Sequence, residues 1–161
     1  MPDPALEIEQ LFAELSASMA FARRPEAIPG DLRLNWRLSA LSLILDRARG
    51  RTLKLEHLHV LWWGMKNAET RSQFLRRLGG ESSPTEMLVR YDPTLSLTVD
   101  LGLGAAVVER TTSGAIKLLP AGVHLAAVAT ETGALEVQRV FLERLPAHFT
   151  QSLLNEMMDW S

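Results

Sequence analysis

The sequence predicts a mainly α-helical fold with a small β wing, and three observations support this prediction. Apolar residues recur at the three- and four-residue spacing of amphipathic helices over most of the 161 residues. Residues 107–119 instead read as two short strands around a turn at 112–114, where Gly114 can adopt the positive φ of a tight hairpin. Pro120 then opens another helix, because its φ is preset and its missing N–H is not needed there. A hairpin between helices is the layout of a winged helix-turn-helix core with extra N- and C-terminal helices.

Composition places the chain among ordinary globular proteins. Apolar residues make up 47% and charged residues 22%, enough of each for a hydrophobic core and a polar surface. No apolar run approaches the roughly 20 residues that span a bilayer, and the acidic start lacks the pattern of a signal peptide. The absence of cysteine excludes disulfides, thiol catalysis and cysteine-ligated zinc. We therefore expect a single cytoplasmic domain over residues 1–161.

The N-terminal part, residues 1–30, is predicted to be a helix followed by a loop. The helix at 4–23 is marked by one apolar stripe, whose members are Ile8, Leu11, Leu15, Met19 and Ala22. Prolines and a glycine interrupt the pattern at 25–31 and predict the loop. Asp31 is the predicted N-cap of the next helix.

The winged-helix core is predicted at 31–131, and two further helices follow at 134–160. Leucine periodicity and the positions of glycine and proline define its elements. They are the helices 31–48, 54–66, 68–78 and 93–106, a short strand at 87–91, the wing, and a helix at 123–131. The last two helices are expected at 134–145 and 147–160, with Thr150 or His148 as a possible cap.

Charge is distributed unevenly along the chain, although the net charge is −2. Residues 1–22 carry four acidic residues and no basic one, a charge of −4. Residues 23–80 carry twelve basic and five acidic residues, a charge of +7. Residues 81–161, which include the wing, carry five basic and ten acidic residues, a charge of −5. Such a division bears on the choice of partners rather than on the fold.

No catalytic, metal or cofactor site is predicted. His57 and His59 are two residues apart, so a helix places them on nearly opposite faces and away from a common metal ion. The chain has no glycine-rich phosphate loop and no H-E-x-x-H motif. Ser113 lies in a turn rather than at the strand-to-helix elbow of a nucleophilic serine. We therefore expect a protein that is not an enzyme.

The helix before the wing decides whether the fold suits DNA. In a DNA-reading winged helix this element enters the major groove and needs donors for phosphates and base edges. Here the helix 93–106 contains no Lys or Arg, and its Asp100 would repel phosphates. The wing adds only Arg110 and Lys117. The sequence therefore predicts a poor DNA reader.

Eight basic residues precede the wing in two groups, and three interpretations of them remain open. They are a solvated surface, a contact for an acidic protein partner, or a non-specific contact with the DNA backbone. The residues are Arg47, Arg49, Arg51, Lys54, Lys66, Arg71, Arg76 and Arg77.

Two adjacent tryptophans and the C-terminal end form a second set of candidate contacts. Trp62 and Trp63 are about 100° apart on a helix, so we do not expect both to lie deep in one core stripe. One caps the edge of the core or anchors an interface, a role that tryptophan favours. Met157 and Trp160 likewise suit either packing or docking.

A family resemblance covers about residues 31–125. Its motifs are K-L-E-x-L at 54–58 after a leucine-rich helix, R-Y-D-P at 90–93, and a wing ending in L-P-A-G at 119–122. In these features the chain resembles the small middle subunit of Lamassu-type systems, which are bacterial ABC-type three-component anti-phage and anti-plasmid defence systems. The resemblance implies a winged-helix accessory subunit that binds an SMC-like coiled-coil ATPase and an effector nuclease in a hetero-oligomer. It implies indirect or weak DNA contact and supplies no catalytic residue.

Two other hypotheses come from different functional classes. A DNA-binding transcriptional regulator would bind a short duplex in a salt-sensitive manner through the wing cations Arg110 and Lys117. A homodimeric scaffold would use the terminal helices as a mutual interface.

Overall fold

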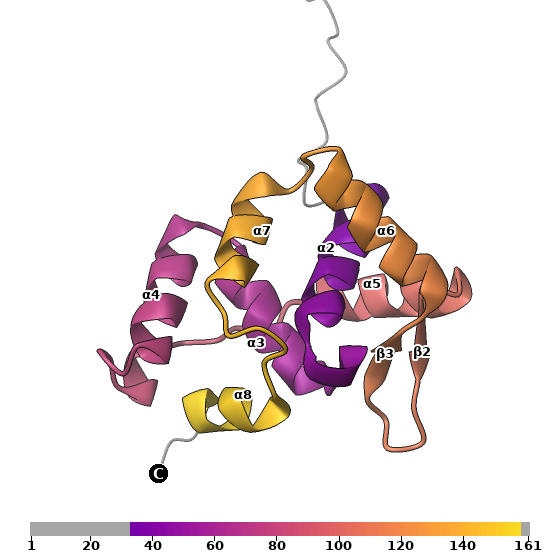
Figure 1. The fold of residues 1–161 in the computed structure, drawn as a ribbon. Helices are drawn as coiled ribbons and strands as arrows, with labels where there is room; N and C mark the ends of the chain where they lie inside the picture. Colours follow the sequence, from indigo (N-terminus) through magenta and orange to yellow (C-terminus); the bar gives the residue numbers. More distant parts are fainter. Residues whose placement is uncertain (1–32, 159–161) are drawn as a thin grey trace, which may run out of the picture.

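The computed structural model describes residues 33–158, and it shows a mainly helical protein with one small antiparallel sheet, as predicted (Figure 1). The predicted helix 4–23, most of the loop that follows it, the Asp31 cap and Trp160 lie outside the described residues. The elements in chain order are α2 (Leu34–Arg47), η2 (Arg49–Arg51), β1 (Thr52–Leu53), α3 (Leu55–Met65), α4 (Ala68–Leu78), η3 (Pro84–Glu86), α5 (Pro93–Gly104), β2 (Val108–Arg110), β3 (Ile116–Leu118), α6 (Pro120–Glu131), α7 (Glu136–Glu143) and α8 (Gln151–Met158).

Helix α2 occupies the centre of the described part, where α5, α6, α7 and β3 pack against it (Figure 1). No charged residue occurs between Arg37 and Asp46, and every apolar side chain from Ala40 to Leu45 is at most 7% exposed. A helix that is apolar around much of its circumference must be covered from several sides. The arrangement of the neighbouring helices follows from this requirement.

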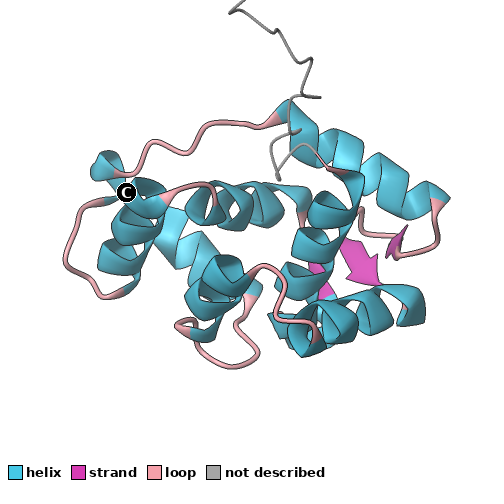
Figure 2. Ribbon diagram, turned by 90° about the horizontal axis from the view of Figure 1, so that it is seen from above, coloured by secondary structure: helices cyan, strands magenta, loops and turns pink. Residues whose placement is uncertain are grey.

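The sheet has three strands in the order β1-β3-β2, all antiparallel, and its strands lie between helices that are drawn above and below them in Figure 2. The hairpin of β2 and β3 was expected, and Gly114 in its turn has a φ of +83°. Strand β1 was not expected, because its two residues are too few to show an alternating pattern. Thr52 pairs with Lys117, so β1 ties the chain before α3 to the wing.

The prediction of a strand at 87–91 is wrong. This stretch forms no strand and leads directly into α5. Met87 is buried and Val89 is half-buried, whereas Leu88 and Tyr91 are exposed. The alternation therefore reflects a loop that lies over the core without a partner strand.

Helix α6 begins at Pro120, three residues earlier than expected, and its first turn packs closely against the wing. The Leu119 N–H donates to the Val107 carbonyl at 2.9 Å. A Cβ added to Gly122 would lie 2.6 Å from the same carbonyl oxygen and would also overlap the Leu118 side chain. Only glycine fits at this junction without a shift of the backbone.

The C-terminal helices are shorter than predicted, while α4 has the predicted bounds of 68–78. Helix α8 begins only at Gln151 because residues 148–149 follow a different path. His148 has a φ of +53°, and the Phe149 carbonyl accepts from the Arg49 N–H at 3.0 Å. Thr150 then caps α8 by accepting from the Leu153 N–H. None of the helices within 33–158 is long and apolar enough to cross a membrane.

A substitution at the wing junction tests this packing. Gly122→Ala should lower the free energy of unfolding by about 1–3 kcal/mol, because the added methyl overpacks a site that contains backbone. Gly104→Ala is the matched control, since nothing lies within 4 Å of the position of its Cβ. The control should be neutral or stabilising by at most about 1 kcal/mol. Urea unfolding measures both, and equal stabilities for the two variants would contradict the described junction.

Candidate protein-docking surface

Helix α5 is the element that a winged helix would present to its ligand, and the sequence fixes both of its ends. Asp92 is the N-cap and accepts from the Thr94 N–H at 2.9 Å, while Pro93 occupies the first turn. The Leu95 and Val99 side chains are buried. A Cβ on Gly102 would lie 3.1 Å from the Val108 side chain, so this glycine permits a close approach to the wing.

The outer face of α5 is apolar and carries no cation. Leu97 is 53% exposed and Leu101 is 38% exposed. With Pro93 they recur every four residues, which places them along one side of the helix. Asp100, which is also exposed, is the only charged residue of α5.

The loop before α5 extends this apolar surface. Leu88 is 65% exposed and Tyr91 is 68% exposed. Both line a hollow of about 530 Å³ whose wall also includes Pro93 and the cations Lys66 and Arg90. We define the α5 face as Leu88, Tyr91, Pro93, Leu97 and Leu101.

A buried histidine supports the start of this face. The His59 ring lies under Tyr91 with 3.6 Å between ring centroids, and its Nδ1 faces the Asp92 N–H at 3.5 Å. Burial lowers the pKa of His59, and this effect exceeds the opposing attraction of the Asp92 carboxylate. His59 is therefore neutral at neutral pH. Its Nε2 is buried and has no hydrogen-bond partner in the described part of the chain.

Asp92, in contrast to the neutral His59, is stabilised in its charged form. Partial burial raises the pKa of Asp92. Hydrogen bonds from Thr94 and the Lys66 ammonium, 3.6 Å away, lower it by more, so the pKa of Asp92 lies below its usual value. Asp92 is therefore ionised, as an N-cap that faces the positive end of a helix dipole should be. These groups form no metal site: no cluster of three or more possible ligands occurs within residues 33–158.

Three of the eight basic residues serve the ends of helices. The Arg47 guanidinium donates to the Leu142 and Leu145 carbonyls at the end of α7, at 3.3 and 3.4 Å. Arg77 donates to the Glu156 and Met157 carbonyls at the end of α8, at 2.9 and 3.2 Å. Arg71 donates to the last carbonyl of α3. Each arginine thus satisfies carbonyls that a helix leaves without internal partners.

Four more of them form ion pairs within the chain. The pairs are Arg51–Asp46 at 2.9 Å, Lys54–Glu56 at 3.7 Å, Lys66–Asp92 at 3.6 Å and Arg76–Glu86 at 3.7 Å. Arg49 is exposed and its side chain has no hydrogen bond or ion pair within the described residues. The sequence left open a solvated surface, an acidic protein partner or the DNA backbone for this segment, and the structure gives seven of its eight cations a partner within the chain.

The tryptophans correct a prediction. Trp62 and Trp63 are 6% and 7% exposed, so both lie in the core, although one stripe cannot hold both. Helix α3 is buried from His57 through Met65, and different neighbours cover its different sides. Trp36 meets the edge of Trp62 at 5.9 Å between ring centroids. Met157 is 3% exposed, so none of these side chains offers the surface that an interface anchor needs.

Comparison with protein-family models, curated proteins and solved structures gave no match for this chain.

The structural role of the basic segment is tested by a pair of arginine substitutions. Arg47→Met keeps the aliphatic stem but removes both bonds to the end of α7, and should cost about 1–3 kcal/mol of unfolding free energy. Arg49→Met removes an exposed guanidinium two residues away and should change stability by at most about 0.5 kcal/mol. Chemical denaturation at one pH and salt concentration compares them. Equal effects would show that Arg47 is no more structural than a surface residue.

Proposed function

We propose that this chain is a non-catalytic, protein-binding subunit of a larger complex. The observation that carries the proposal is the α5 face, which exposes three leucines, a tyrosine and a proline on and just before a helix that contains no Lys or Arg. Covering the exposed part of Leu97 or Leu101 on a partner is worth about 1 kcal/mol each, since each side chain is already partly buried. A DNA groove offers a polyanion instead, which this face cannot neutralise.

The topology supports a winged-helix interpretation of the fold. Helix α5 precedes the β2–β3 hairpin directly, and β1, located between α2 and α3, pairs with β3 as the third strand. In that interpretation α5 takes the position of the recognition helix and the turn at residues 111–115 is the tip of the wing.

The wing itself adds little to a DNA-binding capacity. The Lys117 ammonium lies 3.1 Å from the Glu109 carboxylate across the hairpin. The Arg110 guanidinium folds back to the Gly114 carbonyl at 3.5 Å. The wing therefore offers two cations, one of which is already in an ion pair. A strong DNA binder makes roughly six to ten phosphate contacts.

The nature of the partner comes from the family resemblance. In a Lamassu-type system, the chain would join an SMC-like coiled-coil ATPase to an effector nuclease in the cytoplasm. The α5 face would then contact one of these proteins, and DNA would be contacted by the larger assembly.

The test is co-purification from the native gene neighbourhood. The tagged chain, expressed at native level, should recover a long coiled-coil ATPase in fixed stoichiometry. Leu97→Asp combined with Leu101→Asp should reduce that recovery at least tenfold, because two charges replace buried leucines. Val128→Asp is the control: Val128 is 36% exposed on α6 and does not belong to the α5 face, and recovery should be unchanged.

Recovery of the chain alone would contradict the proposal. So would an equal loss of the partner in the α5 and α6 variants. Recovery of a specific DNA fragment in place of a protein would favour the transcriptional-regulator hypothesis.

A further inference from the structure

The N-cap of α5 takes a hydrogen-bond acceptor from another helix. At the start of α4, the Asn67 N–H donates to the Thr70 hydroxyl at 3.1 Å, so the third residue of that helix satisfies its own N-cap. The third residue of α5 is Leu95, whose side chain has no polar atom. The Asp92 N–H instead faces Nδ1 of His59 on α3 at 3.5 Å. A histidine of α3 thus replaces the missing member of the capping box.

This contact determines which protonation state of His59 the site accepts. Because Nδ1 accepts, the single proton of the neutral ring lies on Nε2, which is buried and has no hydrogen-bond partner within residues 33–158. A second proton would go to Nδ1 and would turn the acceptor into a donor that opposes the Asp92 N–H. The residue is 2% exposed, so the charged ring would also be poorly solvated.

We propose that His59 is an acid-sensitive positioning residue for the α5 face. The neutral ring holds Tyr91 by stacking, with 3.6 Å between ring centroids, and holds Asp92 by the hydrogen bond to its N–H. Protonation releases both, and these two residues lead directly into α5. The consequence for partner binding rests on the proposed function, whereas the coupling of His59 to Tyr91 is a property of the chain alone.

The groups around His59 act on its protonation in opposite directions. Burial lowers the pKa of His59 below the ordinary value of about 6.5, and the Asp92 carboxylate offsets only part of this effect. The Lys66 ammonium lies 3.6 Å from the same carboxylate and competes for it. The folded protein therefore prefers the neutral ring. Protonation begins to cost stability as the pH falls below about 6.5, the value that applies to the unfolded chain.

Other charged groups near Tyr91 and on α3 are exposed or face elsewhere. Arg90 and Glu69 line the hollow beside Tyr91, carry opposite charges and are exposed, so solvent screens both of them. His57 lies on the same helix as His59 but is hydrogen-bonded to α8 at 2.7 Å. An acid-induced change at Tyr91 in the pH range of histidine therefore reports on His59.

An NMR titration of the full chain tests the proposal. Tyr91 is the only tyrosine, so tyrosine labelled with carbon-13 in the ring gives one set of signals. In the parent protein these signals should shift in one step with a midpoint below about pH 6.5, and the Asp92 amide proton should shift with the same midpoint. His59→Asn keeps an acceptor near the position of Nδ1 but does not titrate, so the step should be lost. His59→Phe keeps a ring without either property and should also lose it.

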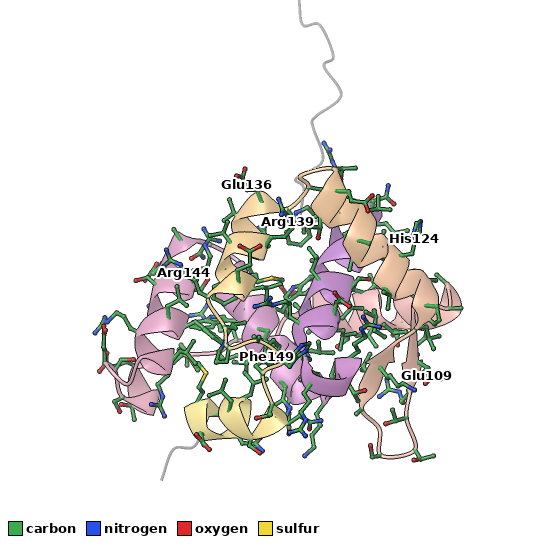
Figure 3. All side chains as sticks on the ribbon, in the orientation of Figure 1. Glu109, His124, Glu136, Arg139, Arg144 and Phe149 are labelled. Atoms are coloured by element: carbon green, nitrogen blue, oxygen red, sulfur yellow. The ribbon has the colours of Figure 1, made fainter. Side chains whose placement is uncertain are left out.

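His124→Asn is the matched control, because His124 is an exposed histidine on α6 (Figure 3) and the step should remain in this variant. Tyr91 signals that do not shift in the parent would overturn the proposal. A step that survives in both His59 variants would overturn it as well. So would a step at which the α2 amide signals also collapse, because the chain would then unfold as a whole instead of opening at Tyr91.

Co-purification at two pH values tests the consequence for binding. Partner recovery should fall severalfold between about pH 7.5 and about pH 5.5 in the parent and should depend less on pH in His59→Asn. Equal pH dependence in the two proteins would contradict regulation of the α5 face by His59. Absence of a partner at both pH values would contradict the proposed function instead, and the NMR titration would still decide whether His59 positions Tyr91.

Discussion

The burial of α2 is the constraint on which the rest of the described structure depends. Its middle has no charge and little exposed surface, so the helices and strand packed against it must each contribute an apolar side. For α5 this contribution is Leu95 and Val99. Gly102 brings α5 so near that an added Cβ would lie 3.6 Å from Leu41 of α2. Because the inner side of α5 is committed to the core, only its outer side, with Leu97 and Leu101, is available for binding.

Two helices end where their last carbonyls are partly buried, and this explains why arginines of the basic segment point into the protein. A helix end leaves carbonyls unpaired, and in a partly buried place they need donors. Arg47 and Arg77 supply them from residues far away along the sequence, 95 to 98 positions for Arg47 and about 80 for Arg77. Two of the cations that distinguish residues 23–80, Arg47 and Arg77, therefore bind the ends of the C-terminal helices α7 and α8. This use of the arginines agrees with a protein whose binding surface is apolar.

Local signals allowed some elements to be predicted closely. The end of α4 was predicted from Gly79 and Gly80, and the structure adds an Asn67–Thr70 capping box at its start. The hairpin follows from Gly114, and the lack of cations on α5 is visible in the sequence itself. Features set by distant contacts were not predictable: β1 exists because β3 lies beside it, and the two tryptophans are buried because α3 is covered from several sides. Likewise, periodicity marks an apolar residue without telling which side of α5 remains exposed, so the α5 face emerged only from the structure.

We proposed that the α5 face binds protein rather than DNA, and the salt dependence of duplex binding distinguishes these two functions. Fluorescence anisotropy of the full chain with a labelled duplex of about 30 base pairs, at about 50 mM to 200 mM salt, gives both the affinity and the slope. For a protein-docking face we expect a dissociation constant no tighter than about 10⁻⁵ M at the lowest salt and a slope in log K against log salt of magnitude at most about 2. A sub-micromolar affinity with a slope of about 6 or more, weakened by Arg110→Ala or Lys117→Ala, would contradict it.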